Sequence, residues 1–460
     1  MITTEVKTLK LKGATMKRKI MQKLIEWKEK SNGHYAALIV GARRVGKSYI
    51  VEEFAKTHYK SYLIINFTKV SDEVKDLFNH QIDNFDIFFT MLQTYYNKTF
   101  YNRDTVLIFD EVQAFPRARE LIKHFVADGR YDYIETGSLM SIKENVKDIL
   151  IPSEEHEIQM YPMDFEEFLW ALGEEDTYEN LKYFYDQKKP LGQALHRKMM
   201  TLFRQYLIVG GMPQAVQAYI DTQNFKKVDT EKRHILTLYD GDIEKHGGKD
   251  ASKIRQVYNL IPNQLSNANK RFMFSAISDT ARYREYEEAL FWLNDARLVN
   301  LCFNTTEPSV GLMTRMDISA FKCYQCDTGL LLSQSFSEKD LAREEIYKKL
   351  LFDKLEFNNG LIVENAVAQM LVSAGHELYY YAESEDRMEI DFLLTKNKIT
   401  SRKNIIPIEV KSGKKYLTNS LNKYREKFAQ QVEKSYILHD GDITEKDDIV
   451  YIPLYMAGML

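Results

Sequence analysis

Short apolar runs alternate with helix-like segments over the first 160 residues of the chain. Each run has the length of a strand, and those at 35–40 and 105–109 have the nearly unbroken apolar character of a strand that is buried on both faces. The runs lie at 35–40, 61–67, 105–110, 131–138 and 156–160. This alternation predicts an α/β fold whose core is a doubly wound, five-stranded parallel sheet.

The pattern changes to helical periodicity without strands over 161–250, which we expect to form a lid over the sheet. A loop at 245–250, KHGGKD, marks a boundary. Beyond it, 251–335 contains three helical segments and a β-hairpin, the order of a winged helix-turn-helix.

The last part of the chain, 336–460, reads helix, three strands, helix, strand. It predicts a second α/β domain. The chain is therefore expected to be multidomain, with successive segments 1–15 (an N-terminal extension), 16–160 (sheet core), 161–250 (helical lid), 251–335 (winged helix) and 336–460 (C-terminal domain).

Composition excludes several classes of protein. No apolar run approaches 18 residues, and the N-terminus has no apolar signal region, so we expect a cytoplasmic protein without a membrane span. Three cysteines in 460 residues form no disulfide framework, and the lone CYQC at 323–326 lacks the second pair of a zinc site. The net charge of −3 gives no overall nucleic-acid signal.

A glycine-rich loop, GARRVGKS, lies between the first strand and a helical segment. In that position, backbone N–H groups of the loop and of the helix N-terminus converge on a phosphate. Lys47 would reach the β- and γ-phosphates, and Ser48 would bind Mg²⁺. The sequence therefore predicts an ATP site with these contacts: Gly41, Ala42, Arg43, Arg44, Val45, Gly46, Lys47, Ser48 and Tyr49.

A second carboxylate-bearing strand end, LIFDEVQ, fits this site. Asp110 would hold the Mg²⁺ through water, and Glu111 would polarise the attacking water. The TGS sequence at 136–138 ends the next strand, where Thr136 or Ser138 would contact the γ-phosphate or the water.

These motifs, with IETGS, YPMDFEEFLWALG and YLIVGGMPQAV, resemble a family of bacterial AAA-type ATPases. In that family a C-terminal domain long left without assigned function follows the ATPase. The resemblance implies ATP and Mg²⁺ as cofactors, and AAA-type ATPases often self-associate as rings. Relatives usually carry Gly-Arg after the TGS strand, whereas this chain reads IPSEEH. Arg43, Arg44 and Arg130 are therefore the candidates for an arginine finger.

Four charged residues of the C-terminal domain form a second candidate site: Glu364, Asp391, Glu409 and Lys411. Glu409 and Lys411 share one face of a strand, and Asp391 on the neighbouring strand can reach Glu409. Asp391 and Glu409 would bind Mg²⁺, while Lys411 would stabilise charge on phosphorus. The set resembles the helix-Glu, Asp, Glu-x-Lys motif of restriction-endonuclease-like nucleases, which implies cleavage of DNA or RNA.

Three interpretations remain open. Residues 396–427 contain ten Lys or Arg and two acids, which favours a nucleic-acid-processing ATPase. Alternatively, the acids persist as ion pairs in a non-catalytic domain of an ATP-dependent switch or scaffold. The third is a DNA-binding regulator that uses Arg282 and Arg284 of the winged helix, against which Glu285, Glu287 and Glu288 argue.

Overall fold

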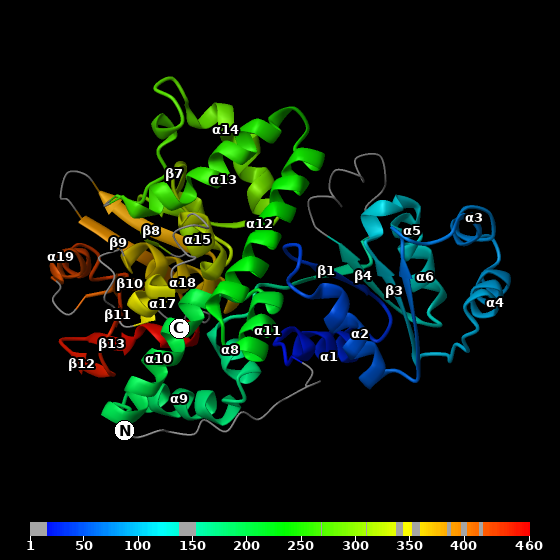
Figure 1. Ribbon diagram of the computed structural model, residues 1–460, viewed down its shortest axis with the longest axis horizontal. Helices are drawn as coiled ribbons and strands as arrows, with labels where there is room; N and C mark the ends of the chain where they lie inside the picture. The colour runs from blue at the N-terminus through cyan, green and yellow to red at the C-terminus, as the bar shows by residue number, and fades with distance from the viewer. Residues whose placement is uncertain are drawn as a thin grey trace.

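The computed structural model describes residues 16–137, 153–267, 269–309, 311–336, 344–351, 359–383, 388–396, 403–413 and 417–460. Two sheets dominate the chain, and helices cover both of them (Figure 1).

The first sheet is the predicted doubly wound one, and its five strands are all parallel. They are β1 (Ala36–Val40), β2 (Ser61–Asn66), β3 (Thr105–Asp110), β4 (Asp132–Gly137) and β5 (Glu155–Gln159). Their order is β2-β3-β4-β1-β5. The chain therefore crosses over β3 and β4 between β1 and β2, and the carboxyl ends of β1 and β3 lie at one edge.

Helices cover both faces of this sheet, because its central strands are apolar on both sides. On β1, Ala37 and Ile39 pack in the same core as Leu24 of α1. Leu38 and Val40 pack in a separate core on the other face. The helices of this α/β unit are α1 (Ile20–Ser31), α2 (Lys47–His58), α3 (Asp72–His80), α4 (Phe85–Tyr96), η1 (Val112–Ala114), α5 (Pro116–Glu120) and α6 (Ile122–Asp128).

The region predicted as a lid is helical. Its helices are α8 (Phe165–Ala171), α9 (Glu175–Gln187), α10 (Gln193–Val209), α11 (Pro213–Thr222) and α12 (Phe225–His246). The side chain of Asn224 accepts from the N–H groups of Lys226 and Lys227 and so caps α12. The segment expected as a boundary loop instead forms η2 (Gly248–Asp250), which leads directly into α13 (Ala251–Ser266).

The second sheet has eight strands in the order β12-β13-β11-β10-β9-β8-β6-β7. They are β6 (Val299–Thr305), β7 (Met316–Gln325), β8 (Leu378–Glu383), β9 (Met388–Thr395), β10 (Ile405–Lys411), β11 (Ser435–His439), β12 (Thr444–Lys446) and β13 (Ile449–Pro453). Strand β6 pairs in parallel with β8, with Cys302 opposite Leu378. The hairpin of 251–335 and the strands of 336–460, predicted as separate domains, thus share one sheet.

Helices and short 3₁₀ turns surround this sheet: η3 (Phe274–Ala276), α14 (Tyr283–Asp295), η4 (Leu312–Arg315), α15 (Thr328–Ser335), α17 (Glu344–Leu351), α18 (Asn359–Ser373), α19 (Asn419–Lys427) and η5 (Leu454–Met459). Of the three helices predicted before the hairpin of 251–335, the structure forms α13 and α14 but only the short turn η3 between them, and the winged helix stays a prediction. The three cysteines are buried free thiols. In the part of the chain described here, no helix is long and apolar enough to cross a bilayer.

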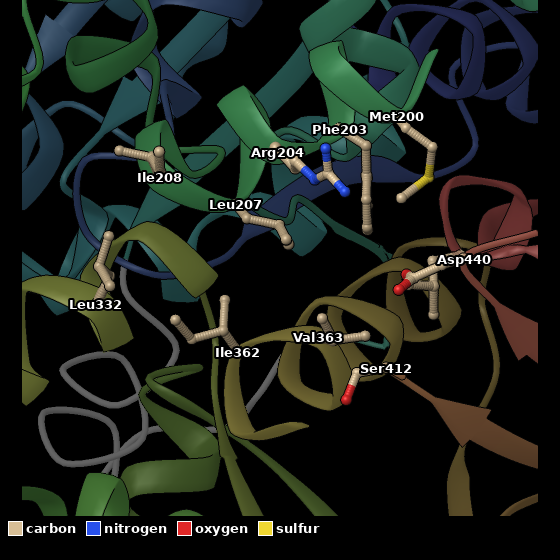
Figure 2. A pocket seen from close by; sticks show the side chains of 11 residues that line it. Met200, Phe203, Arg204, Leu207, Ile208, Leu332, Ile362, Val363, Ser412 and Asp440 are labelled. Atoms are coloured by element: carbon tan, nitrogen blue, oxygen red, sulfur yellow. The ribbon is translucent and has the colours of Figure 1, made fainter. Parts of the chain in front are cut away.

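The lid and the C-terminal part pack directly on each other. Figure 2 shows Phe203 and Leu207 of α10 facing Ile362 and Val363 of α18, with Leu332 of α15 beside them. The cavity that remains between them has a volume of only about 50 Å³. Most of the side chains that line this space are apolar, so the contact between the two parts is largely apolar.

Candidate nucleotide site and acidic cluster

The glycine-rich loop connects β1 to α2 in a conformation that its sequence makes possible. Gly46 has a φ of 98° directly before α2, in the left-handed region that glycine tolerates. At Gly41, a Cβ atom would collide with the carbonyl oxygen of Met160. The Lys47 ammonium donates to the carbonyl oxygens of Gly41 (2.9 Å) and Ala42 (3.1 Å). Lys47 therefore lies folded over the loop, beside the N-terminus of α2 where a phosphate is expected to bind.

Asp110, at the end of β3, is the centre of a hydrogen-bond network. Its Oδ1 accepts from Ser48 Oγ (2.8 Å) and Thr136 Oγ1 (2.5 Å), and its Oδ2 accepts from Asn66 Nδ2 (2.6 Å). A hydroxyl and a carboxylate at this separation fit Mg²⁺, which prefers oxygen ligands and retains several waters. Thr136 is thus brought to the site, whereas Ser138 lies outside the described residues.

Glu111 follows β3 with a φ of 55°, unusual for a residue with a side chain. Its Oε2 accepts from Gln113 Nε2 at 2.5 Å. Glu111, Lys47 and Ser48 line one cleft of about 1030 Å³, together with Arg43, Arg44, Gly46 and Tyr49. Ala42 and Val45 are buried, so only their backbone groups are available to a ligand.

Helix α12 closes this cleft from the lid side, a contact that sequence reasoning missed. Asp242 Oδ1 lies 2.5 Å from the Arg43 guanidinium, and Tyr239 donates to the Arg43 carbonyl at 2.9 Å. Gln214 and Gln217 of α11 also line the cleft. The chain separates Arg43 from Asp242 by 199 residues, and no local pattern indicates the pairing.

Arg18 is a second residue that the sequence did not single out. It is only 5 % exposed, and its guanidinium donates to the carbonyls of Val45 (2.8 Å) and Tyr161 (2.7 Å) and to Glu167 (3.0 Å). This arginine fixes the glycine-rich loop to the start of the lid. In the sequence it is one of several basic residues in MKRKIM, and none of them is distinguished by pattern.

The candidate arginine fingers differ in their partners. Arg130 forms ion pairs with Asp86 (2.6 Å) and Asp128 (2.8 Å). Arg43 is paired with Asp242, and Arg44, with a φ of 70°, lies exposed at the cleft. Arg43 and Arg44 are both exposed at the nucleotide cleft, whereas Arg130 does not line it.

The acidic residues of the C-terminal part lie together as predicted, but with cations between them. Pairing of β9 with β10 places Ile408 opposite Phe392, and the continued register brings Asp391 opposite Glu409. Asp391 accepts from the Val410 N–H at 2.8 Å. Glu409 pairs with Lys411 at 2.8 Å, as expected for one strand face.

Lys322 lies between Glu364 of α18 and Asp391 of β9, and the sequence did not single it out. Lys322 of β7 lies 3.3 Å from Glu364, 2.8 Å from Glu389 and 3.7 Å from Asp391. Lys270 and the Tyr324 hydroxyl also bind Glu364.

The environment of this cluster shifts the pKa values of its acids in opposite directions. Burial alone would raise the pKa of Glu364, but Lys322 and Lys270 hold it at about 2. Burial and the neighbouring Glu364 carboxylate raise the pKa of Asp391, and burial raises that of Glu409. Among the described residues, no three acidic, histidine or cysteine side chains form a metal-binding group.

The predicted DNA-contacting helix is α14. Arg282 and Arg284 are exposed at its start, as are Glu285 and Glu288. The Arg282 guanidinium donates to the carbonyls of Asp279 (3.0 Å) and Ala281 (2.9 Å). DNA contact by this segment stays a prediction.

Three family models match the chain: an AAA domain at 33–169, a domain of unknown function (DUF8612) at 200–340 and another (DUF4143) at 359–456. The AAA match and the site geometry make this chain a P-loop ATPase. The DUF4143 family is described only as a domain of unknown function, so the nuclease resemblance of the C-terminal part stays a prediction. No curated protein matches the chain in sequence.

Solved structures with a similar arrangement include a Walker-type ATPase of Pyrococcus abyssi, with 12% identity, 70% of this chain and 96% of that chain covered, and a TM-score of 0.40. The Thermotoga maritima RuvB Holliday junction branch migration motor has 10% identity, coverage of 62% and 89%, and a TM-score of 0.29. Cdc6p from Pyrobaculum aerophilum has 11% identity, coverage of 75% and 97%, and a TM-score of 0.28.

Proposed function

We propose that this chain is a Mg²⁺-dependent ATPase that acts as a switch, in which the nucleotide controls how helix α12 lies between the two sheets (Figure 1). One observation carries the proposal: α12 contacts both the phosphate-binding loop and helix α15, which packs against α18 and β7 of the second sheet. Tyr239 and Asp242 bind Arg43, while Asp229, on the same helix, accepts from Ser333 of α15 at 2.6 Å. A rigid helix held at both ends transmits a change at one end to the other.

The chain's own groups account for the chemistry at the ATP end. The Lys47 ammonium exchanges its carbonyl partners for phosphate oxygens, and the loop N–H groups bind the same phosphates. Ser48 and Asp110 would hold Mg²⁺, which neutralises charge on the phosphates. Glu111 orients the attacking water, and Arg43 exchanges Asp242 for phosphate, which releases one contact of α12.

Hydrogen exchange in α12, measured alongside ATP turnover, tests the proposal. We expect Lys47→Ala to abolish turnover, and chelation of Mg²⁺ to do the same reversibly. ATP should change amide exchange around Tyr239 and Asp242 in the wild type and leave it unchanged in Lys47→Ala. ATP binding and turnover without any change in α12 would contradict the switch but leave the ATPase intact.

Cleavage of DNA or RNA is a second candidate function, favoured by Asp391 and Glu409, which lie directly next to the paired residues Phe392 and Ile408 of β9 and β10, with Lys411 beside Glu409. In this case Glu364, Asp391 and Glu409 would act with Mg²⁺ at the phosphodiester. A plasmid and single-strand cleavage assay with Mg²⁺, with and without ATP, tests it. Loss of cleavage in Lys411→Ala and Asp391→Ala, with ATP turnover retained, would support a nuclease. Absence of cleavage in the wild type favours the switch.

A further inference from the structure

Lys322 is a charged residue in the interior of the protein. It lies in β7, its side chain is 1 % exposed, and the acids around it come from two other elements. Glu364 lies on α18, whereas Glu389 and Asp391 lie on β9. An ammonium group is stable at such a depth only when carboxylates surround it, and here three do so within 3.7 Å.

The oxygens of Glu364 and Asp391 all face a partner. One oxygen of Glu364 accepts from Tyr324 and faces Lys322, and the other binds Lys270. Asp391 uses Oδ2 for the Val410 N–H and turns Oδ1 toward Lys322. A divalent cation between Glu364 and Asp391 would have to displace these donors and lie beside a buried positive charge. The space between Glu364 and Asp391 therefore does not fit a metal ion in this arrangement.

We propose that the Lys322 ammonium is a built-in cation that takes the place of a divalent metal ion in the acidic cluster. The lysine comes from within the segment matched at 200–340, and Glu364 and Asp391 from within the segment matched at 359–456. The acids thus join the hairpin β6–β7 to the C-terminal strands as an ionic core. This inference is independent of ATP turnover.

The position of Lys322 in the backbone makes this cation permanent. Lys322 pairs with Cys302 in the middle of the β6–β7 ladder, and β6 in turn pairs with β8. The strand pairing therefore fixes the backbone that carries the ammonium beside the acids. This distinguishes it from Lys411, which is partly exposed at the end of β10 and contacts Glu409 alone among the acids of the cluster.

Mn²⁺ binding to the nucleotide-free full-length protein, followed by electron paramagnetic resonance of free Mn²⁺, tests the inference. We expect the wild type and Asp391→Asn to bind equal amounts of Mn²⁺. Lys322→Met, which keeps the length of the side chain and removes its charge, should bind one additional Mn²⁺ per chain. Asp391→Asn in the Lys322→Met background should abolish that additional binding, and Lys322→Arg should show no gain.

Two results would overturn the inference. One is Mn²⁺ binding by the wild type that Asp391→Asn removes, which would place the metal beside Lys322. The other is a Lys322→Met protein that hydrolyses ATP at the wild-type rate, and is therefore folded, but gains no Mn²⁺. If Lys322→Met does not fold, the inference is tested by comparing the amounts of Mn²⁺ that the wild type and Asp391→Asn bind.

Discussion

Glu111 combines a carboxylate in the nucleotide cleft with a left-handed backbone, φ 55°. Such a conformation costs on the order of 1 kcal/mol or more in a residue with a side chain, and it persists where the surroundings hold it. Here the preceding strand is buried and the following η1 turn begins at once. The strain points the side chain into the cleft rather than along the sheet edge.

Glu111→Gln should lower ATP turnover by about 100-fold or more, because an amide does not accept the proton of the attacking water. ATP affinity should stay near the wild-type value, since the phosphate contacts come from Lys47 and the loop. A steady-state phosphate-release assay and equilibrium binding of ATP measure the two quantities. Glu53→Gln, in the same cleft, is the matched control and should turn over ATP normally.

Lys232 is a buried ionisable residue of the lid whose protonation affects stability. It lies in α12, fully buried, and donates to the Ile208 carbonyl at 2.7 Å. Burial lowers the pKa of its ammonium from 10.5 to about 8, although Asp229 and Asp327 act in the opposite direction.

Between pH 8 and 10.5 the unfolded chain holds a proton at Lys232 that the folded chain has released. The free energy of unfolding of the wild type should therefore rise with pH in this window, relative to Lys232→Met, by about 1.4 kcal/mol per pH unit. Urea unfolding of both proteins at several pH values measures the difference. A difference that is independent of pH would show that Lys232 keeps its ordinary pKa.

At the scale of elements, the N-terminus of α15 connects the lid to the second sheet. Asp327 caps this helix through the Leu330 N–H at 2.9 Å and also accepts from the Gly211 N–H at 2.5 Å. A Cβ atom at Gly329 would collide with the carbonyl of Val209, so the two backbones pack without space for side chains. The GGMP sequence at 210–213 is thus a docking point for α15.

Asp327→Ala should lower the free energy of unfolding by about 3 kcal/mol, because two buried N–H donors lose their acceptor. Thermal or urea unfolding measures the loss. Asp72→Ala removes an acid from the first turn of α3, where the side chain is 93% exposed, and should change stability by less than about 0.5 kcal/mol. Equal effects of the two substitutions would rule out the capping role of Asp327.

At the scale of the whole molecule, the parallel pairing of β6 with β8 determines how the chain divides into structural units. The hairpin completes the sheet, and it also contributes Lys322 to the acidic cluster. Without the hairpin, β8 would become an open edge with unpaired backbone groups. The second sheet is therefore one folding unit that spans two predicted domains.

A fragment of residues 336–460 should aggregate, whereas 251–460 should be folded and disperse in solution. The reason is the exposed β8 edge and the unpaired Glu364 in the shorter fragment. Light scattering and circular dichroism of the two fragments measure this difference. A monomeric, folded 336–460 fragment would contradict the shared sheet as a requirement for folding.

Local sequence sufficed for the first sheet and for the core of the ATP site. GARRVGKS and LIFDEVQ act through backbone geometry and through residues at strand ends, which a few neighbouring positions specify. The strands β8 to β11 were also predictable, because buried apolar runs bounded by polar turns are a local signal. Asp391, Glu409 and Lys411 were placed correctly on their strands for the same reason. Strands β12 and β13 were missed, since the sequence analysis expected the strand at 435–440 to be the last.

Only the tertiary structure determined the partners of these residues. Lys322 reaches Glu364 across 42 residues of chain, and Asp242 reaches Arg43 across 199. Such contacts depend on the order of strands in the second sheet and on the path of α12. Hydrophobic periodicity along the sequence does not predict either of these. The sequence by itself determined the glycine-rich loop, the carboxylates at the end of β3 and the acids on β9 and β10, but it did not indicate Asp242 or Lys322. The long-range pairing of strands, which buries charges together, decided that a lysine rather than solvent lies among the acids.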